Sequence, residues 1–89
     1  MSQGAEALLR FPCDFPIKAM GREVDGFELL VVELIRRHVP DLRENAVAVR
    51  PSRNGRYLSV TVTVRATSQE QLDAIYRDLS TCEAVLMAL

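Results

Sequence analysis

Residue types that usually mark a reaction or a metal site are scarce in this sequence. It has no tryptophan, one histidine (His38), one lysine (Lys18) and two cysteines, Cys13 and Cys82. The cysteines are too far apart for a CxxC pair or a zinc-ligand spacing, and one histidine does not complete such a site. We therefore expect no metal, no cofactor and two reduced thiols.

The chain also lacks a large net charge and a long apolar run. Eleven basic residues against twelve acidic ones give a formal net charge of −1, so no overall basic field attracts nucleic acid or an anionic membrane. No stretch approaches the ~18 apolar residues of a membrane span, and no basic segment followed by an apolar run opens the chain. These absences predict a cytoplasmic protein that binds neither nucleic acid nor membrane.

The composition that remains, 48% hydrophobic and 26% charged over 89 residues, is typical of one globular domain. Residues 1–10 have weak signals, in which Ala5 and Leu8 permit either a short helical turn or a frayed, disordered tail. Residues 11–89 are expected to form the domain. Pro12 and Pro16 exclude a helix at its start, and the alternation that follows predicts a strand over residues 11–21.

Two segments have the spacing of amphipathic helices. Residues 24–41 place apolar side chains on one helical face, with Asp25 and Glu28 as a capping box and His38 as a charge in the last turn rather than a catalyst. Residues 67–80 also place apolar side chains on one helical face, and either Thr67 or Ser68 is expected to cap this helix.

Three further segments predict strands. Residues 44–53 form a short strand with Val47 and Val49 inward, and Asn54-Gly55 predicts a two-residue turn in which both residues take positive φ. Residues 56–66 alternate: the inward set is Leu58, Val60, Val62, Val64 and Ala66, and the outward set is Tyr57, Ser59, Thr61, Thr63 and Arg65. Residues 82–89 are apolar on both faces, and we assign Ala84, Leu86 and Ala88 to the open face.

This order predicts an α+β fold of the ferredoxin-like βαββαβ type, a four-stranded antiparallel sheet with two helices on one face and the first and third strands in its centre. The first and last strands are then antiparallel neighbours. Cys13 and Cys82 begin them at opposite ends, roughly 20–25 Å apart, which is too far for a disulfide.

The outward residues of the third strand lie on the sheet face that no helix covers. Threonine suits a wet strand surface, so these residues either only face solvent or contact a partner or ligand. Lys18, the lone ammonium beside Ser59 and Thr61, is either a surface lysine or the group that holds a carboxylate. Around the hairpin, Arg50, Arg53 and Arg56 with Ser52 form either a solvated turn or a contact for an anion or an acidic protein.

The chain also resembles a known family. The motifs are "FP" (11–12) with Phe15, "KAMG" (18–21), "RHVP" (37–40), "PSRNGRYLSVTVTV" (51–64), "EQ" (70–71), Tyr76 and Leu79. Over residues 11–89 they resemble the YbeD-like family of small bacterial proteins of unknown function, whose genes look associated with lipoate synthesis. The resemblance implies a ferredoxin-like fold similar to ACT domains, which bind amino acids beside metabolic enzymes. In those domains a glycine near the first helix lets a ligand approach; Gly21, Asp25 and Gly26 stand in that place, where ordinary turn chemistry also explains them.

Other functions of this fold fit less well. An acylphosphatase needs a glycine-spaced loop around Arg22, and an RNA-recognition module needs more aromatic residues on its central strands than Tyr57. We expect no enzyme but a small regulatory or binding domain, a homodimer or a partner of a metabolic protein, that senses a small metabolite or modulates an enzyme. The alternative is a protein–protein adaptor that uses the open sheet face without a small ligand. The candidate binding residues are Lys18, Gly21, Asp25, Gly26, Ser52, Arg53, Arg56, Tyr57, Ser59, Thr61 and Thr63.

Overall fold

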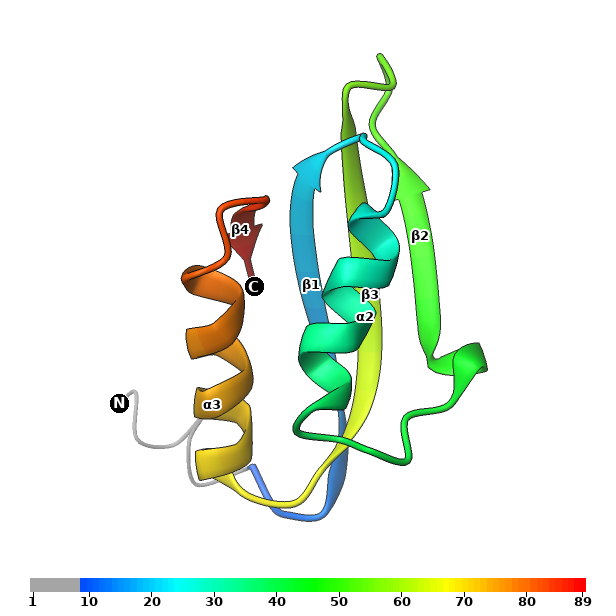
Figure 1. The fold of residues 1–89 in the computed structure, drawn as a ribbon. Helices are drawn as coiled ribbons and strands as arrows, with labels where there is room; N and C mark the ends of the chain where they lie inside the picture. The colour runs from blue at the N-terminus through cyan, green and yellow to red at the C-terminus, as the bar shows by residue number, and fades with distance from the viewer. Residues whose placement is uncertain (1–8) are drawn as a thin grey trace, which may run out of the picture.

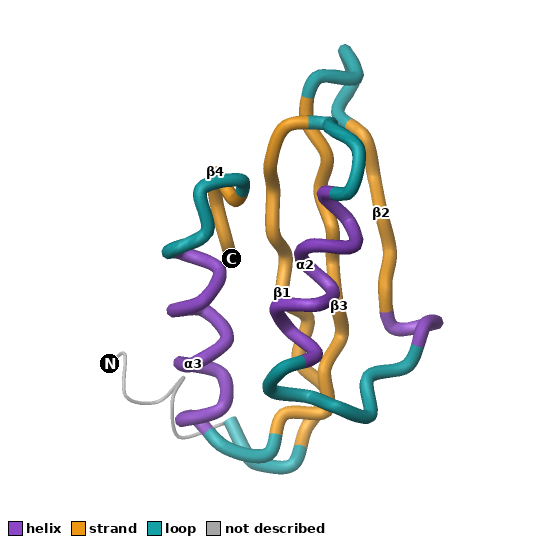
Figure 2. The backbone as a smooth tube through the Cα atoms, viewed as in Figure 1, coloured by secondary structure: helices purple, strands orange, loops and turns teal. Residues whose placement is uncertain are grey.

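The computed structural model describes residues 9–89 and has the predicted order of elements (Figure 1). They are β1 (Cys13–Arg22), α2 (Phe27–Arg36), a 3-10 turn η1 (Glu44–Ala46), β2 (Val47–Pro51), β3 (Tyr57–Ala66), α3 (Gln69–Ser80) and β4 (Val85–Ala88). The sheet order is β2-β3-β1-β4 with antiparallel pairs throughout, and both helices lie on one face (Figure 2). The ferredoxin-like prediction is confirmed. Residues 1–8 of the expected tail lie outside the described residues.

The two central strands form the base of the core. β1 and β3 pair along their whole length, from Cys13 opposite Ala66 to Arg22 opposite Tyr57. Their inward side chains are sealed by the helices. The fully buried strand residues are Ile17, Ala19, Val60, Val62, Val64 and Ala66, and the helix residues over them are Phe27, Val31, Ile35, Leu72, Ile75 and Leu79. Burying one such aliphatic side chain stabilises the fold by about 1.5–3 kcal/mol.

The two helices begin differently. Gly26, with φ 86°, precedes α2 and no side chain caps it, so the expected Asp25–Glu28 capping box is wrong. Glycine adopts a positive φ without steric cost, so Gly26 allows the chain to turn into the helix. Glycine has no side chain that could accept a capping hydrogen bond. At α3 the expected cap is present: the Gln71 main-chain N–H donates to Ser68 Oγ at 3.0 Å.

The turn between β2 and β3 is longer than the sequence predicts. The strands end at Pro51 and resume at Tyr57, and among residues 9–89 no residue other than glycine has a positive φ. Only Gly55, with φ 74°, does so within this loop. Asn54 instead contributes its side chain, whose Oδ1 accepts from Ser52 Oγ at 2.9 Å and from the Arg56 main-chain N–H at 3.1 Å.

A bulge near Leu86 changes the face assigned to the last strand. Gly21 pairs with Val85, but Met20 pairs with Met87, so the register shifts between them. Beyond the bulge, Leu89 exchanges two main-chain hydrogen bonds with Lys18, at 2.8 and 3.0 Å. Paired residues share a face. Met87 and Leu89 therefore lie on the open face, whereas Ala84 and Ala88 pack against the core, and our assignment of those alanines to the open face is wrong.

Candidate functional site

The open sheet face carries its outward side chains in rows that cross the strands. One row contains, from β4 to β2, Met87, Met20, Ser59 and Arg50. The next contains Leu89, Lys18, Thr61 and Ala48. Each row thus runs from apolar side chains at β4 to hydroxyl groups on β3, with one cation in each row.

A shallow hollow lies where these rows meet the hairpin. Its volume is about 230 Å³, and it is lined by Lys18, Met20, Arg50, Pro51, Ser52, Tyr57, Leu58 and Ser59. Lys18 and Arg50 are two strands and one row apart, so their Cα atoms are about 12 Å from each other. Their long side chains can therefore reach the same ligand. This place suits a small anion that also has an apolar part.

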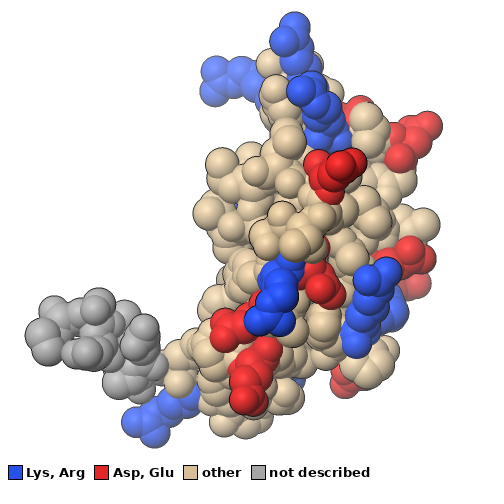
Figure 3. Space-filling view, turned by 60° about the vertical axis from the view of Figure 1, so that its left-hand side comes forward, with Lys and Arg blue, Asp and Glu red and all other residues tan. Residues whose placement is uncertain are grey.

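The charges of this face favour an anion. Asp14 is the only acid among the outward residues of the four strands, and it lies at the far end of β1, where its Oδ1 is 3.3 Å from Arg65 Nη1. Within residues 9–89, neither Lys18 nor Arg50 has an ion-pair partner. More basic side chains gather at the hairpin end of the molecule, at the top of Figure 3.

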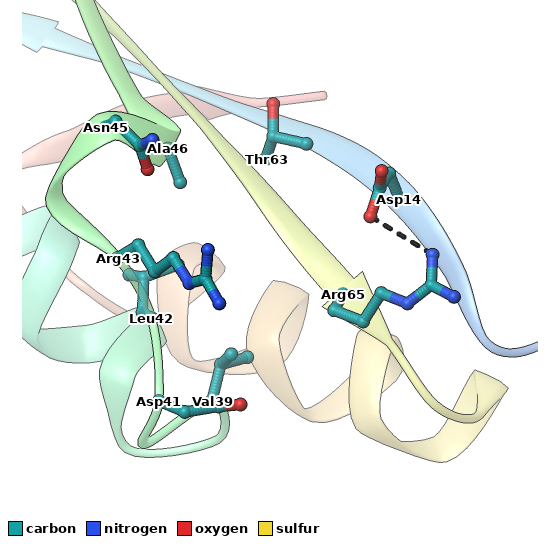
Figure 4. Close-up of a pocket in the computed structure, with 9 residues that line it drawn as sticks. All are labelled: Asp14, Val39, Asp41, Leu42, Arg43, Asn45, Ala46, Thr63 and Arg65. Carbon is teal, nitrogen blue, oxygen red and sulfur yellow. Dashed lines mark hydrogen bonds and ion pairs between the residues drawn. The ribbon is translucent and has the colours of Figure 1, made fainter.

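A second hollow, of about 480 Å³, lies at the opposite end of β3 (Figure 4). Arg43 points into it from the loop before β2, while Arg65 turns toward Asp14. Asp41 and Asp14 balance these two arginines, so this hollow has no net charge to select an anion. Sequence reasoning did not find it, because its residues come from an irregular loop and a strand end without a shared motif.

Several predicted site residues lie away from the open face. Gly21 faces the core, and Asp25 and Gly26 border a separate groove beside α2. Arg53 and Arg56 belong to the hairpin loop and do not line the open-face hollow. The structure therefore brings together Lys18, Ser52, Tyr57 and Ser59, with Thr61 beside them.

Thr63 lines the Arg43 hollow instead. The two thiols, Cys13 and Cys82, are both free. None of the helices in residues 9–89 combines the length and the apolarity that crossing a membrane requires. In the same part of the chain, no three histidine, cysteine or acidic side chains gather as metal ligands would.

Comparisons with known proteins extend over nearly the whole chain. A family described as "Protein of unknown function (DUF493)" matches residues 6–89. A UPF0250 protein of Nitrosomonas europaea is 45% identical over 84 residues, which cover 94% of this chain and 97% of that protein. A UPF0250 protein of Chromobacterium violaceum is 46% identical over the full length of both chains.

One solved structure supports the fold alone. The solution structure of protein HP0495 from H. pylori superimposes with a TM-score of 0.68 at 15% identity, covering 91% of this chain and 85% of that one. At this identity the likeness concerns the arrangement of the backbone and not what the two proteins bind.

Proposed function

Since the chain belongs to the DUF493 family of small bacterial proteins of unknown function, we propose a function from its own site: a non-catalytic, cytoplasmic regulatory module that binds a small carboxylate with a short apolar chain. The observation that carries this proposal is the pair of cations, Lys18 and Arg50, which flank the hollow at Ser59 without an ion-pair partner in residues 9–89.

Each part of the site has a role in this proposal. The Lys18 ammonium and the Arg50 guanidinium attract the carboxylate, and the guanidinium can hold both of its oxygens at once. Hydroxyl groups of Ser59 and Thr61 donate further hydrogen bonds. The thioether of Met20 adapts its shape to an apolar chain that runs along the row toward β4. This combination matches a fatty-acid-like carboxylate better than a fully polar anion.

The residues that line the hollow favour binding over catalysis. None of them is a histidine, a cysteine or an acid, so the serine hydroxyl groups of the hollow have no imidazole or carboxylate among the lining residues to activate them as nucleophiles. By analogy with the ACT domains, ligand binding would change how the domain associates, either with a second copy or with a metabolic protein. That association is the regulatory step of the proposal.

Exposed apolar side chains favour a second candidate function, that of a protein–protein adaptor. Met87 and Leu89 are 51% and 62% exposed, and both lie on the open face. Their burial against a protein surface would contribute to binding without any small ligand. The two candidates differ in one respect: only the first requires Lys18 and Arg50 to bind a free carboxylate.

A thermal-shift assay separates them. We would measure the unfolding midpoint with octanoate, lipoate and amino acids, in the parent chain and in the Lys18→Met and Arg50→Gln variants. A ligand at 100 times its Kd stabilises the fold by about 2.7 kcal/mol, which raises the midpoint of a small domain by on the order of 10 °C. Both variants should lose this shift.

The matched control is Arg53→Gln, because Arg53 is a neighbouring arginine that does not line the hollow. Its shift should equal that of the parent chain. If no carboxylate stabilises the parent chain, or if Lys18→Met keeps the full shift, the regulatory module is wrong and the adaptor is favoured. Light scattering with and without the ligand then tests whether binding changes the association state.

A further inference from the structure

The edge strand β2 is only partly covered on its helix side: Val47 packs against the core, and the rest of the strand is exposed. α2 packs on β1 and β3, and α3 packs on β4 and β3. In Figure 1, β2 lies at the right-hand edge of the sheet, on the side of α2 that faces away from α3. Val49 pairs with the fully buried Val60 and so faces the helix side, yet it is 39% exposed. Val49 thus faces inward, as predicted, but it is left exposed because neither helix covers this part of the strand.

A groove with apolar walls results between β2 and α2. Val47 and Leu58 contribute from the sheet, and Leu29 and Val32 from the helix, to a volume of about 660 Å³. Leu29 is 61% exposed, and Val24, which also lines the groove, is 56% exposed. Such a concentration of exposed aliphatic side chains marks an interaction surface rather than a solvated one.

The rim of this groove is acidic. The acids that border it are Glu23, Asp25, Glu28 and Glu44. Arg36 is the single cation on the rim, and its Nη1 is already engaged, donating to the main-chain oxygen of Leu42 at 3.0 Å. An apolar floor inside an acidic rim is complementary to a segment with apolar residues on one side and basic residues on the other.

We propose that this groove binds a basic amphipathic helix of a partner protein. Neighbouring helices pack about 8–10 Å apart. A helix placed beside α2 would therefore lie over β2 and extend the helical layer across this edge strand. Its apolar face would cover Leu29, Val32 and Val49, and its basic flanks would lie against Glu28 and Glu44. This is the helix-in-groove mode of recognition.

Neither helix within residues 9–89 would supply such a basic helix from a second copy of the chain. α2 carries two glutamates and one arginine within Phe27–Arg36, and α3 carries three acids and one arginine within Gln69–Ser80. Docking either helix into the groove of another copy would bring like charges together, which is unfavourable. The groove is also separate from the open sheet face, so the inference stands whether or not a carboxylate binds there.

The test uses a labelled synthetic peptide of about 14 leucine and lysine residues arranged as an amphipathic helix, a length of about 21 Å. Fluorescence anisotropy with the full chain should show saturable binding that weakens as salt is added. Leu29→Asn should weaken binding at least tenfold, because it removes an apolar contact without adding a charge that would attract the lysines of the peptide. The matched control is Leu86→Asn, because Leu86 is 57% exposed but lies at the β4 bulge, outside the groove.

Circular dichroism checks that each variant folds, and Val24→Asn replaces Leu29→Asn if the latter does not, because Val24 also lines the groove and is exposed. Three results would overturn the inference. The first is the absence of saturable binding, and the second is equal binding of a scrambled peptide of the same composition. The third is self-association of the parent chain that Leu29→Asn abolishes, which would assign the groove to a second copy.

Discussion

Gly21 lies directly beneath the ring of Phe27, where β1 passes under the first turn of α2. A Cβ atom on Gly21 would fall against that ring and 2.5 Å from the main-chain oxygen of Ala84. Phe27 is 2% exposed, so its ring has little room to move. The missing side chain therefore allows the helix and β4 to approach β1 closely. Packing explains this glycine, and the ligand approach suggested by the ACT resemblance is not needed.

The first prediction concerns this contact. Gly21→Ala should lower the free energy of unfolding by about 1–3 kcal/mol, because it overpacks the core. In a Phe27→Leu background the cost should be smaller, since part of the clash is gone. Urea denaturation measures both values.

The matched control for that substitution is Gly26→Ala. No atom lies within 4 Å of a Cβ built there, but Gly26 has φ 86°. Its cost therefore comes from the backbone and should be the same in both backgrounds. If Phe27→Leu relieved both substitutions equally, the steric explanation for Gly21 would fail.

Much of the fold follows from the sequence where a strand has partners on both sides. The alternation of β3 identified its buried residues, because this central strand pairs with β1 without irregularity over ten residues. The outward hydroxyl groups of Ser59 and Thr61 were recognised for the same reason. The likeness of a solved structure supports the same architecture, while the match to a family of unknown function adds no activity.

The sequence could not predict features that depend on the register between strands. β4 is four residues long and apolar on both faces, so alternation cannot tell which side chains face the core, and the bulge near Leu86 reverses them. Arg50 was grouped with Arg53 and Arg56 because they are near in sequence. Only the pairing of Arg50 with Ser59 places it on the open face.

The second prediction concerns the link between the two helices. His38 Nε2 lies 2.7 Å from Asp78 Oδ2, and Gln71 Nε2 donates to the His38 main-chain oxygen at 3.0 Å. His38 thus joins α3 to the end of α2 rather than serving only as a helix-end charge. Asp78→Ala should cost about 1 kcal/mol of unfolding free energy, because a partly buried partner of the imidazole is lost.

Asp73→Ala is the control for Asp78→Ala. Asp73 lies on the same helix but accepts only an exposed hydrogen bond, from Gln69 Nε2 at 3.0 Å. Its removal should cost a few tenths of a kcal/mol, as is usual for exposed pairs on a helix. Equal costs for the two alanine variants, measured by thermal and urea unfolding, would contradict a structural role for the His38 contact.

The third prediction concerns alkaline pH. The Tyr76 hydroxyl donates to the main-chain oxygen of Leu89 at 2.8 Å, and burial raises the pKa of this phenol above its ordinary value. A pKa that is higher in the folded state contributes stability that is fully present below the unfolded pKa. That stability is lost as the pH rises through the folded pKa. The parent chain should therefore lose stability above about pH 10.

Tyr76→Phe removes this dependence, so its unfolding midpoint should fall less between pH 9 and pH 11, a range that brackets the ordinary tyrosine pKa of about 10. The control is Tyr57→Phe, which removes the only other phenol of the chain and should keep the alkaline loss. Identical pH profiles for the parent chain and Tyr76→Phe would show that the Tyr76–Leu89 hydrogen bond does not hold β4 in place.

The last prediction compares two threonines of the same strand and rests on the proposed carboxylate site. Thr61 is half-buried and pairs with Lys18, whereas Thr63 is exposed and lines the Arg43 hollow. Valine keeps the shape of threonine but removes its hydroxyl group. Thr61→Val should weaken binding of the stabilising carboxylate by roughly 2–10-fold, the value of one hydrogen bond of about 0.5–1.5 kcal/mol, and Thr63→Val should leave it unchanged. Isothermal titration measures both. The reverse pattern would place the ligand beside Arg43 and Arg65, where Asp14 and Asp41 would have to give way to it, and the role assigned to Lys18 would be wrong.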